Sequence, residues 1–511
     1  MKTSPLVTSA LVMTLAACAA EAPPPAPAPR VALLVPVPSP PPPDPLGSQP
    51  VIPAAAAYVP PAPEVFTAKN GLTIWLLERH ALPYVALAMA VPAGASSDAK
   101  NEGGLALATA DMLDEGAGTR GATELSRAID ALGASLSTTA NVDQSRVSMS
   151  VLKKNLAPAF ALFADVVARP RFEPGEWTRL HEILVNDLTE RQSDPDEVAK
   201  VVMRRVLYGD AHPYGHPVEG TLASAKVWSL GDVQRFYKQA WRPDRATLVA
   251  VGDVTHAELA ALVDGSLGNW QAPKTPAAAP LAPAAPTGPW PKLVLVDRPD
   301  APQSVIAVAR PGLAASDPST PVATRANVAL GGAFTSRLNQ DLREEHGYTY
   351  GASSRLSFSR GVGSFVASAA VMTDKTAEAL KAMLGDIDGF SKNGLTDAEV
   401  DKTRSHARAE LVETFEGVDT AAGQLAADAA LGLGPDYERT AATRRDAAVK
   451  ADLDALARGH FDVSGSVTVV VGPRAQLEGP LRALGYMDIE LRDAEGNRVV
   501  PAPPPKSAKP K

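Results

Sequence analysis

The sequence repeats its own landmarks once, at nearly constant spacing. In each half a proline precedes a short apolar run that ends near a glycine, and a second apolar run ends in glycine close to the end of the half. The matched positions are Pro83 and Pro302, Gly94 and Gly312, and Gly252 and Gly472, at offsets of 219, 218 and 220 residues. Constant offsets of this size indicate a duplicated domain, so the chain is predicted to fold as two similar halves.

Segments rich in proline and alanine divide the 511 residues. They favour extended polyproline geometry and cannot supply a core. We therefore expect a signal peptide at 1–17, a tether at 18–63, a first domain at 64–270, a linker at 271–289, a second domain at 290–487 and a tail at 488–511.

Each half alternates between strand-like and helix-like patterns. Residues 72–77 and 85–91 are β-rich runs, whereas 124–132, 155–168 and 374–390 place apolar residues at three- and four-residue spacing. This alternation predicts an α+β fold in which each half is a mostly antiparallel sheet with helices covering one face.

The charge balance restricts the classes of partner. Lysine and arginine number 49 against 57 aspartates and glutamates, which gives a net charge of -8. A chain of this charge without a strongly basic block is not expected to bind nucleic acid. The single cysteine, Cys18, also excludes a disulfide within the chain.

The first residues have the features of a secretion signal. Lys2 precedes an apolar run at 6–16 that is too short to span a bilayer, and the run leads into Leu15-Ala16-Ala17-Cys18. These four residues resemble the lipobox of bacterial lipoproteins, in which the cysteine is acylated. Acyl chains on Cys18 would hold the chain to a membrane at about 0.8 kcal/mol per buried CH₂. With Ala19 next, we expect an outer-membrane lipoprotein on the periplasmic or surface side; the alternative is an ordinary cleaved signal.

Short motifs follow one another in an order that is typical of one family. They are Asn70-Gly71-Leu72-Thr73, Val91-Pro92-Ala93-Gly94-Ala95, Gly103-Gly104-Leu105-Ala106, Asp194-Pro195, His212-Pro213-Tyr214-Gly215-His216-Pro217 and Phe236-Tyr237. Together they resemble the insulinase/pitrilysin family of metallopeptidases over about residues 64–486. The resemblance implies two homologous halves that form one half of a clamshell chamber.

The zinc motif of that family is replaced here. Active members carry His-x-x-Glu-His directly after Gly-Leu-Ala, and the matching positions are Leu107, Ala110 and Asp111. The third ligand corresponds to Asp187. The two aspartates offer fewer than the three protein ligands of a catalytic zinc. The resemblance therefore implies no catalytic residue, metal or cofactor on this chain, with zinc expected on a partner subunit.

The remaining histidines offer no obvious replacement. His212 and His216 have i,i+4 spacing, but Pro213 and Gly215 between them exclude a regular helix, which favours a structural loop. His181 is followed by glutamate as in a His-Glu-x-x-His motif, yet position 185 is valine.

One acidic group leaves two interpretations open. Asp111, Asp114 and Glu115 fall on one face of a predicted helix. They either form a weak site for a hard cation or are simply a solvated acidic face.

The second half keeps a motif that the first half lacks. Residues 336–350 resemble the C-terminal signature of the family, in which an arginine and a tyrosine contact substrate; these correspond to Arg343 and Tyr350. Residues 334–345 are predicted to form a helix that Gly347 ends as a left-handed cap. A guanidinium donates to peptide carbonyls and a phenol to a developing oxyanion. The alternative is an arginine paired with a neighbouring glutamate and a tyrosine packed on the sheet.

These features predict a non-catalytic, substrate-binding subunit of a two-subunit zinc metallopeptidase. Such a chain would be inactive alone, would pair with a homologous zinc-bearing subunit, and would bind extended peptides in the cell envelope by strand addition. A peptide-binding or scaffolding lipoprotein without a peptidase partner is the alternative. An active enzyme with a different site is a third possibility, for which the sequence shows no supporting group of residues.

Overall fold

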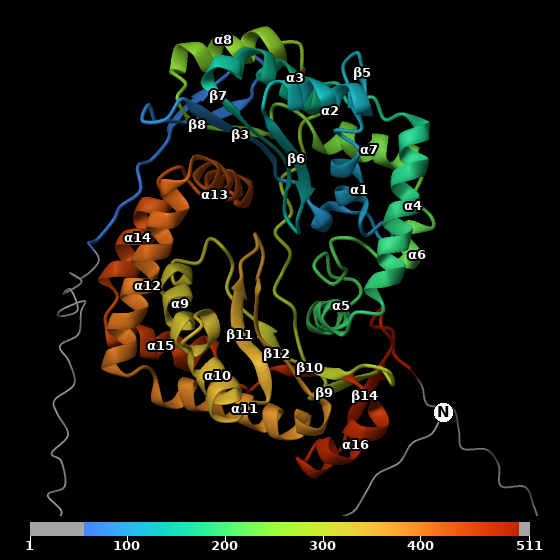
Figure 1. Cartoon of the computed structure of the whole chain (residues 1–511), viewed down its shortest axis with the longest axis vertical. Coiled ribbons are helices and arrows are strands. Elements are labelled where there is room, and N and C mark those ends of the chain that lie inside the picture. The colour runs from blue at the N-terminus through green and yellow to red at the C-terminus, as the bar shows by residue number, and fades with distance from the viewer. Residues whose placement is uncertain (1–55, 500–511) are drawn as a thin grey trace, which may run out of the picture. The chain divides into compact units, whose positions relative to one another are not determined.

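The computed structural model describes residues 56–499. Cys18, the predicted signal peptide and most of the tether lie outside this range, as do residues 500–511. Within it, the first and second halves each form a six-stranded sheet (Figure 1).

The sheet of the first half has the strand order β1-β2-β8-β3-β7-β6. Its strands are β1 (Glu64–Thr67), β2 (Thr73–Glu78), β3 (Tyr84–Val91), β6 (Ser135–Ala140), β7 (Ser145–Leu152) and β8 (Thr247–Gly252), with β4 (Gly116–Ala117) and β5 (Arg120–Gly121) forming a separate hairpin. The helices are α1 (Leu105–Asp111), α2 (Ala122–Ala131), α3 (Leu156–Ala168), α4 (Pro174–Arg191), α5 (Pro195–Tyr208), α6 (Leu222–Ala225), α7 (Leu230–Ala240) and α8 (His256–Leu267).

The sheet of the second half has the order β11-β12-β10-β13-β9-β14. Its strands are β9 (Leu293–Asp297), β10 (Gln303–Pro311), β11 (Thr349–Ser357), β12 (Ser364–Met372), β13 (Val467–Gly472) and β14 (Ile489–Arg492). The helices are α9 (Thr320–Asn327), α10 (Arg337–Asn339), α11 (Thr376–Asn393), α12 (Asp397–Glu416), α13 (Val418–Leu431), α14 (Tyr437–Ala447), α15 (Lys450–His460) and α16 (Arg474–Ala483), with π-helical segments η3 (Val328–Gly332) and η4 (Gln340–Glu345).

The two sheets have the same core topology. In the first, β8 pairs antiparallel with β3 and parallel with β2; in the second, β13 pairs antiparallel with β10 and parallel with β9. The glycines at offset 220 close the equivalent strands β8 and β13. Most strand pairs are antiparallel. The predicted α+β class and the two homologous halves are confirmed.

Both faces of each sheet are buried, whereas the sequence led us to expect helices on only one face. The inner strands carry apolar side chains in both directions, which is the pattern of a doubly covered sheet. Trp75, Leu77 and Val249 on the second face of the first sheet pack against α13, which belongs to the second half. Val294, Val305 and Val469 on the second sheet pack against α5, which belongs to the first half. The two halves therefore exchange one helix each.

In each half, a long helix leads the chain from its own sheet to the helix that packs on the sheet of the other half (Figure 1). The helix α4 leads into α5 beside the second sheet, and α12 leads into α13 beneath the first sheet. The helix α5 begins sharply because the carboxylate of Asp194 accepts hydrogen bonds from the backbone N–H of Asp196 and Glu197, and Pro195 occupies the first helical position. The alanine-rich face of α13 permits its close approach to the first sheet.

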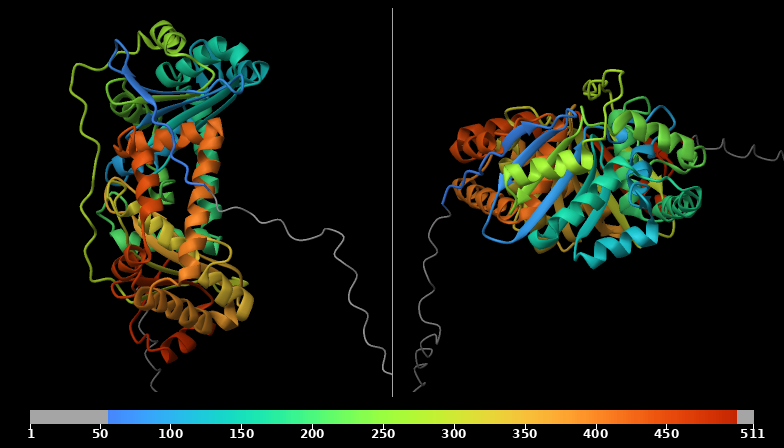
Figure 2. Two further views of the ribbon diagram at one scale, coloured as in Figure 1. Left: turned by 90° about the vertical axis from the view of Figure 1, so that its left-hand side faces the viewer. Right: turned by 90° about the horizontal axis from the view of Figure 1, so that it is seen from above.

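The connection between the halves has no regular structure. Residues 271–289 form no helix or strand and run along one side of the folded part (Figure 2, left). The segment predicted as a tail, 488–511, contributes strand β14, which pairs in parallel with β9. Across residues 56–499, none of the helices combines the length and apolar character needed to cross a membrane.

We expect the exchanged helix α13 to be essential for stability. Leu425 is 2% exposed where α13 meets the first sheet, and Leu425→Ala should lower the free energy of unfolding by about 2–5 kcal/mol because it leaves a cavity. Denaturant unfolding monitored by circular dichroism measures this change. Val412→Ala, at a side chain 41% exposed on α12, should cost no more than about 0.5 kcal/mol; equal losses in both variants would contradict a tightly packed exchange.

Candidate functional site

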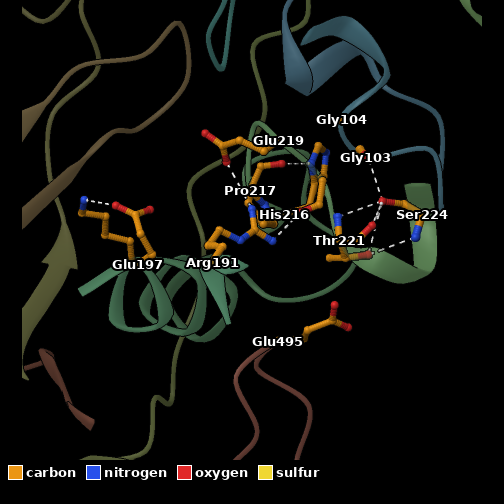
Figure 3. Close-up of polar contacts among 12 residues, drawn as sticks. Gly103, Gly104, Arg191, Glu197, His216, Pro217, Glu219, Thr221, Ser224 and Glu495 are labelled. Atoms are coloured by element: carbon orange, nitrogen blue, oxygen red, sulfur yellow. Dashed lines mark hydrogen bonds and ion pairs between the residues drawn. The ribbon is translucent and has the colours of Figure 1, made fainter. Parts of the chain in front are cut away.

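The helix that carries the replaced zinc motif is firmly held at its start. Asp98 accepts hydrogen bonds from the backbone N–H of Gly104 and of Ala106, both at 2.8 Å. Gly104 has φ +99°, and a Cβ at this position would lie 2.4 Å from the Trp228 ring. A Cβ at Gly103 would likewise lie 2.9 Å from the His216 ring, and the Gly103 carbonyl accepts a hydrogen bond from the Ser224 hydroxyl at 2.7 Å (Figure 3). The Gly103-Gly104 pair therefore allows α1 to pack against the 216–228 segment.

The motif positions on α1 offer almost no metal ligands. Leu107 is partly buried against the core, Ala110 is fully buried, and Asp111 is the last residue of the helix. Asp187 is exposed on α4. Leu107 and Ala110 have no lone pair to donate, so these residues do not fit a catalytic zinc. Among residues 56–499, no group of three or more His, Cys, Asp or Glu side chains is arranged to hold a metal ion.

The three acids after this motif do not share one helix face as predicted, because α1 ends at Asp111. Asp114 and Glu115 lie in the turn that follows, and Glu115 pairs with Arg179 at 2.5 Å. Burial, followed by repulsion from Asp114 and Glu115, raises the pKa of Asp111 to about 7. Burial likewise raises the pKa of Asp114 to about 6. This part of the molecule therefore disfavours negative charge at neutral pH.

The histidines of the first half make local hydrogen bonds. The His212 ring contacts the Ala284 carbonyl at 2.9 Å, the His216 ring contacts the Pro217 carbonyl at 3.1 Å, and the His181 ring contacts the Ala225 carbonyl at 2.8 Å. Burial lowers the pKa of His216. His212 and His216 lie in the loop after α5, as the intervening proline and glycine predicted.

The signature of the second half is built differently from the helix predicted at 334–345. A short helix begins at Arg337, and from Gln340 to Glu345 the chain winds as a π-helix. Such wider turns are frequent at functional sites. Gly347 has φ +63° and ends the segment as predicted, with its N–H donating to the Arg343 carbonyl at 3.1 Å.

Arg343 is partly exposed on this π-helix. Its guanidinium lies 4.5 Å from the ring centroid of Phe334, which is itself 67% exposed, and 3.3 Å from the Glu344 carboxylate. The ring and the carboxylate together orient the guanidinium at the surface. Glu344 is the neighbouring glutamate that was expected as an alternative partner, whereas the contact with the exposed Phe334 ring was not predicted.

Tyr350 points away from the sheet at a β-bulge. The register between β11 and β12 shifts between Thr349 and Ala352, and the Thr349 hydroxyl donates to the Gly351 and Ala370 carbonyls at 2.9 and 2.6 Å. Bulges redirect side chains next to functional sites. Tyr350 is 89% exposed and so is not packed on the sheet. No motif in the sequence indicated this bulge.

Asn339 joins the two parts of the signature. Its side-chain oxygen accepts a hydrogen bond from the Ala352 backbone at 3.1 Å, and its amide donates to the Phe334 carbonyl at 2.6 Å. Asn339 is 3% exposed. The π-helix and the bulged strand are thereby held as one unit, which presents Arg343 and Tyr350 on the second half while α1 lies on the first (Figure 1).

Comparison with known proteins agrees with this arrangement of two unequal halves. A model described as insulinase, peptidase family M16, matches residues 74–220, and a model described as the peptidase M16 inactive domain matches residues 228–406. The chain belongs to the insulinase family.

Individual relatives of the insulinase family support the assignment. An uncharacterized zinc protease of Mycobacterium bovis is 27% identical over 370 residues, covering 72% of this chain and 82% of that protein. A probable mitochondrial-processing peptidase subunit beta of Schizosaccharomyces pombe is 25% identical over 265 residues, covering 50% of this chain and 56% of that protein. The crystal structure of a peptidase M16 inactive domain from Pseudomonas fluorescens superimposes with a TM-score of 0.74 at 25% identity, covering 80% and 98% of the two chains.

We expect Asp111 to make stability depend on pH. Its folded pKa of about 7 lies above the usual value of about 3.9, so the folded state loses stability as pH rises through this window. Asp111→Asn removes this pH dependence. The free energy of unfolding of the variant, relative to that of the unsubstituted protein, should therefore increase by about 2 kcal/mol between pH 5 and pH 8.

Denaturant unfolding at the two pH values measures this difference. Asp130→Asn on the exposed part of α2 is the control and should show no such trend. A stability difference for Asp111→Asn that stays constant from pH 5 to pH 8 would contradict the elevated pKa.

Proposed function

We propose that this insulinase-family chain is a non-catalytic, peptide-binding subunit that acts with a homologous zinc-bearing subunit. The observation that carries the proposal is the contrast between its two motifs. Arg343 and Tyr350 are presented at the surface on a hydrogen-bonded support, whereas Leu107 and Ala110 occupy the zinc-motif positions with side chains that bind no metal. Substrate contact and metal binding are thus separated between this chain and a partner.

The chemistry of the exposed pair fits an extended peptide. The guanidinium of Arg343 offers several N–H donors to backbone carbonyls, and the phenol of Tyr350 offers one O–H donor. The supporting strand β11 lies at the edge of its sheet, where unpaired backbone groups are able to accept a further strand. In a complex, the Tyr350 hydroxyl would face the carbonyl whose oxygen becomes negatively charged on the zinc of the partner.

One relative supports the proposal that this chain acts together with a partner subunit. The Schizosaccharomyces pombe relative is named as a subunit, which implies an assembly of more than one chain for that protein. By analogy, we propose that this chain closes over its partner like one half of a clamshell. Peptides or unfolded polypeptides of the cell envelope would be bound between the two subunits.

The proposed location rests on the N-terminal sequence. Acylation of Cys18 would place the folded part at the outer membrane, at the end of the Pro/Ala-rich tether. Metabolic labelling with a palmitate analogue should mark the native chain and leave Cys18→Ser unmarked. Equal labelling of both proteins would remove the anchor from the proposal.

Purified alone, the chain should contain no stoichiometric zinc and should cleave no peptide, because its motif positions lack three metal ligands. Elemental analysis and cleavage of unstructured peptides, with and without a chelator, test both points. Tightly bound zinc together with chelator-sensitive cleavage would refute a non-catalytic role.

Arg343→Ala should weaken binding of labelled, unstructured peptides by about tenfold, since it removes a charged hydrogen-bond donor. Tyr350→Phe should reduce turnover in the presence of the zinc-bearing homologue while leaving complex formation intact. Fluorescence anisotropy and peptide cleavage report the two effects. Arg439→Ala, at an exposed position on α14, is the matched control, and its peptide binding should be unchanged.

The outcomes also separate the alternative function. Peptide binding that depends on Arg343, with no turnover in any mixture with zinc-bearing homologues, would indicate a scaffolding lipoprotein. Binding that is insensitive to both substitutions would overturn the assigned role of this site.

A further inference from the structure

A cavity of about 310 Å³ lies where the exchanged helices of the two halves meet. The first half contributes residues 141–144, Tyr214 and the α5 residues Met203, Arg204 and Tyr208. The second half contributes residues 357–359, Ser364 and the α13 residues Ala427, Ala430 and Leu431. The cavity lies apart from Arg343 and Tyr350, neither of which lines it.

Arg204 is the only basic side chain in the wall of this cavity. Its guanidinium forms no hydrogen bond or ion pair with any of residues 56–499. Burial lowers its pKa, and the nearby Tyr208, Glu219 and Asp143 only oppose that effect. Part of the side chain remains accessible because it faces the cavity.

Two acids lie near Arg204, and one of them, Asp143, also lines the cavity. Asp143 accepts hydrogen bonds from the Tyr214 hydroxyl at 3.0 Å, from the Arg360 backbone at 2.7 Å and from the Ser96 hydroxyl at 3.3 Å. Glu219 pairs with Arg191 at 3.4 Å (Figure 3). Both acids attract Arg204 through space without forming a hydrogen bond to it, so its N–H donors remain available on the cavity side. Arg204 is therefore placed to receive a negative group from outside the chain.

The rest of the wall restricts the size and type of that group. Phe358, Leu431 and Met203 supply apolar surface, while Ser359 and Ser364 supply hydroxyls close to the same space. A guanidinium forms paired hydrogen bonds with a carboxylate. The volume is of the order of ten water molecules at roughly 30 Å³ each, which suits a small organic molecule with one charged end.

We propose that the cavity binds a small carboxylate with an apolar body, held by Arg204. Two sources share this chemistry, a short-chain fatty acid and the C-terminal end of a short peptide. Because the cavity is lined by both α5 and α13, the bound molecule would contact both halves and stabilise their association. This binding is independent of the proposed peptidase partnership.

Thermal unfolding and isothermal titration of the whole protein test the proposal. Hexanoate and the dipeptide Ala-Leu represent the two sources, and hexanamide and Ala-Leu amide are their neutral counterparts. At least one carboxylate should bind and raise Tm by a few degrees, and neither amide should do so at the same ionic strength. Equal shifts with the amides or with sodium chloride, or no binding of either carboxylate, would overturn the proposal.

Variants link the effect to the cavity. Arg204→Met should weaken carboxylate binding by about tenfold or more, because it removes the guanidinium that would pair with the carboxylate. Arg205→Met is the matched control, since Arg205 bonds outside the cavity to the Glu495 carbonyl and to Asn497, and it should retain binding.

Ala427→Leu gives a second test that leaves Arg204 in place. The larger side chain would occupy the cavity and should abolish the carboxylate response while the protein remains folded. An undiminished response in Arg204→Met or in Ala427→Leu would disprove the site. Loss of folding in Arg204→Met would show that the arginine is structural and would overturn the proposal as well.

Discussion

The packing of α5 on the second sheet and of α13 on the first is the interaction on which the rest of the molecule depends. Without it, each sheet would expose a face rich in valine, alanine and tryptophan to water, at a cost of roughly 25 cal/mol per Å² of apolar surface. The exchange also fixes where the two motifs lie, because α1 and η4 are each anchored to one of the two sheets. The two segments are therefore carried by different halves of the molecule, and the exchanged helices hold those halves together.

The segment around α1 and the segment around Arg343 differ in the polar groups that surround them. Around α1, Gly103 and Gly104 allow close helix packing, and apolar side chains occupy two of the positions that resemble the zinc motif of the family. Around Arg343, the polar support remains complete: Asn339 links strand to helix, and Thr349 shapes the bulge. This contrast between the two segments is the basis of the proposed binding role.

Local signals predicted much of this structure. The spacing of prolines and glycines indicated the duplicated sheets, and Gly347 indicated the end of the helical segment that carries Arg343. The exchange of helices was not predictable, since an amphipathic pattern shows that α13 buries one face but not which sheet it covers. The π-helix and the bulge at Tyr350 were also missed, because both arise from tertiary contacts, such as those of Asn339, rather than from local propensity.

The reciprocal exchange of α5 and α13 also says something about how such a chain arises by duplication. A single half contains both a sheet with one open face and a helix suited to cover the equivalent face of a sister copy. Two identical halves would therefore close by a twofold symmetric swap, as homodimers often do. The linker at 271–289 joins two such complementary units in one chain, so each half is able to differ in sequence from the other while the shared helix exchange keeps them together.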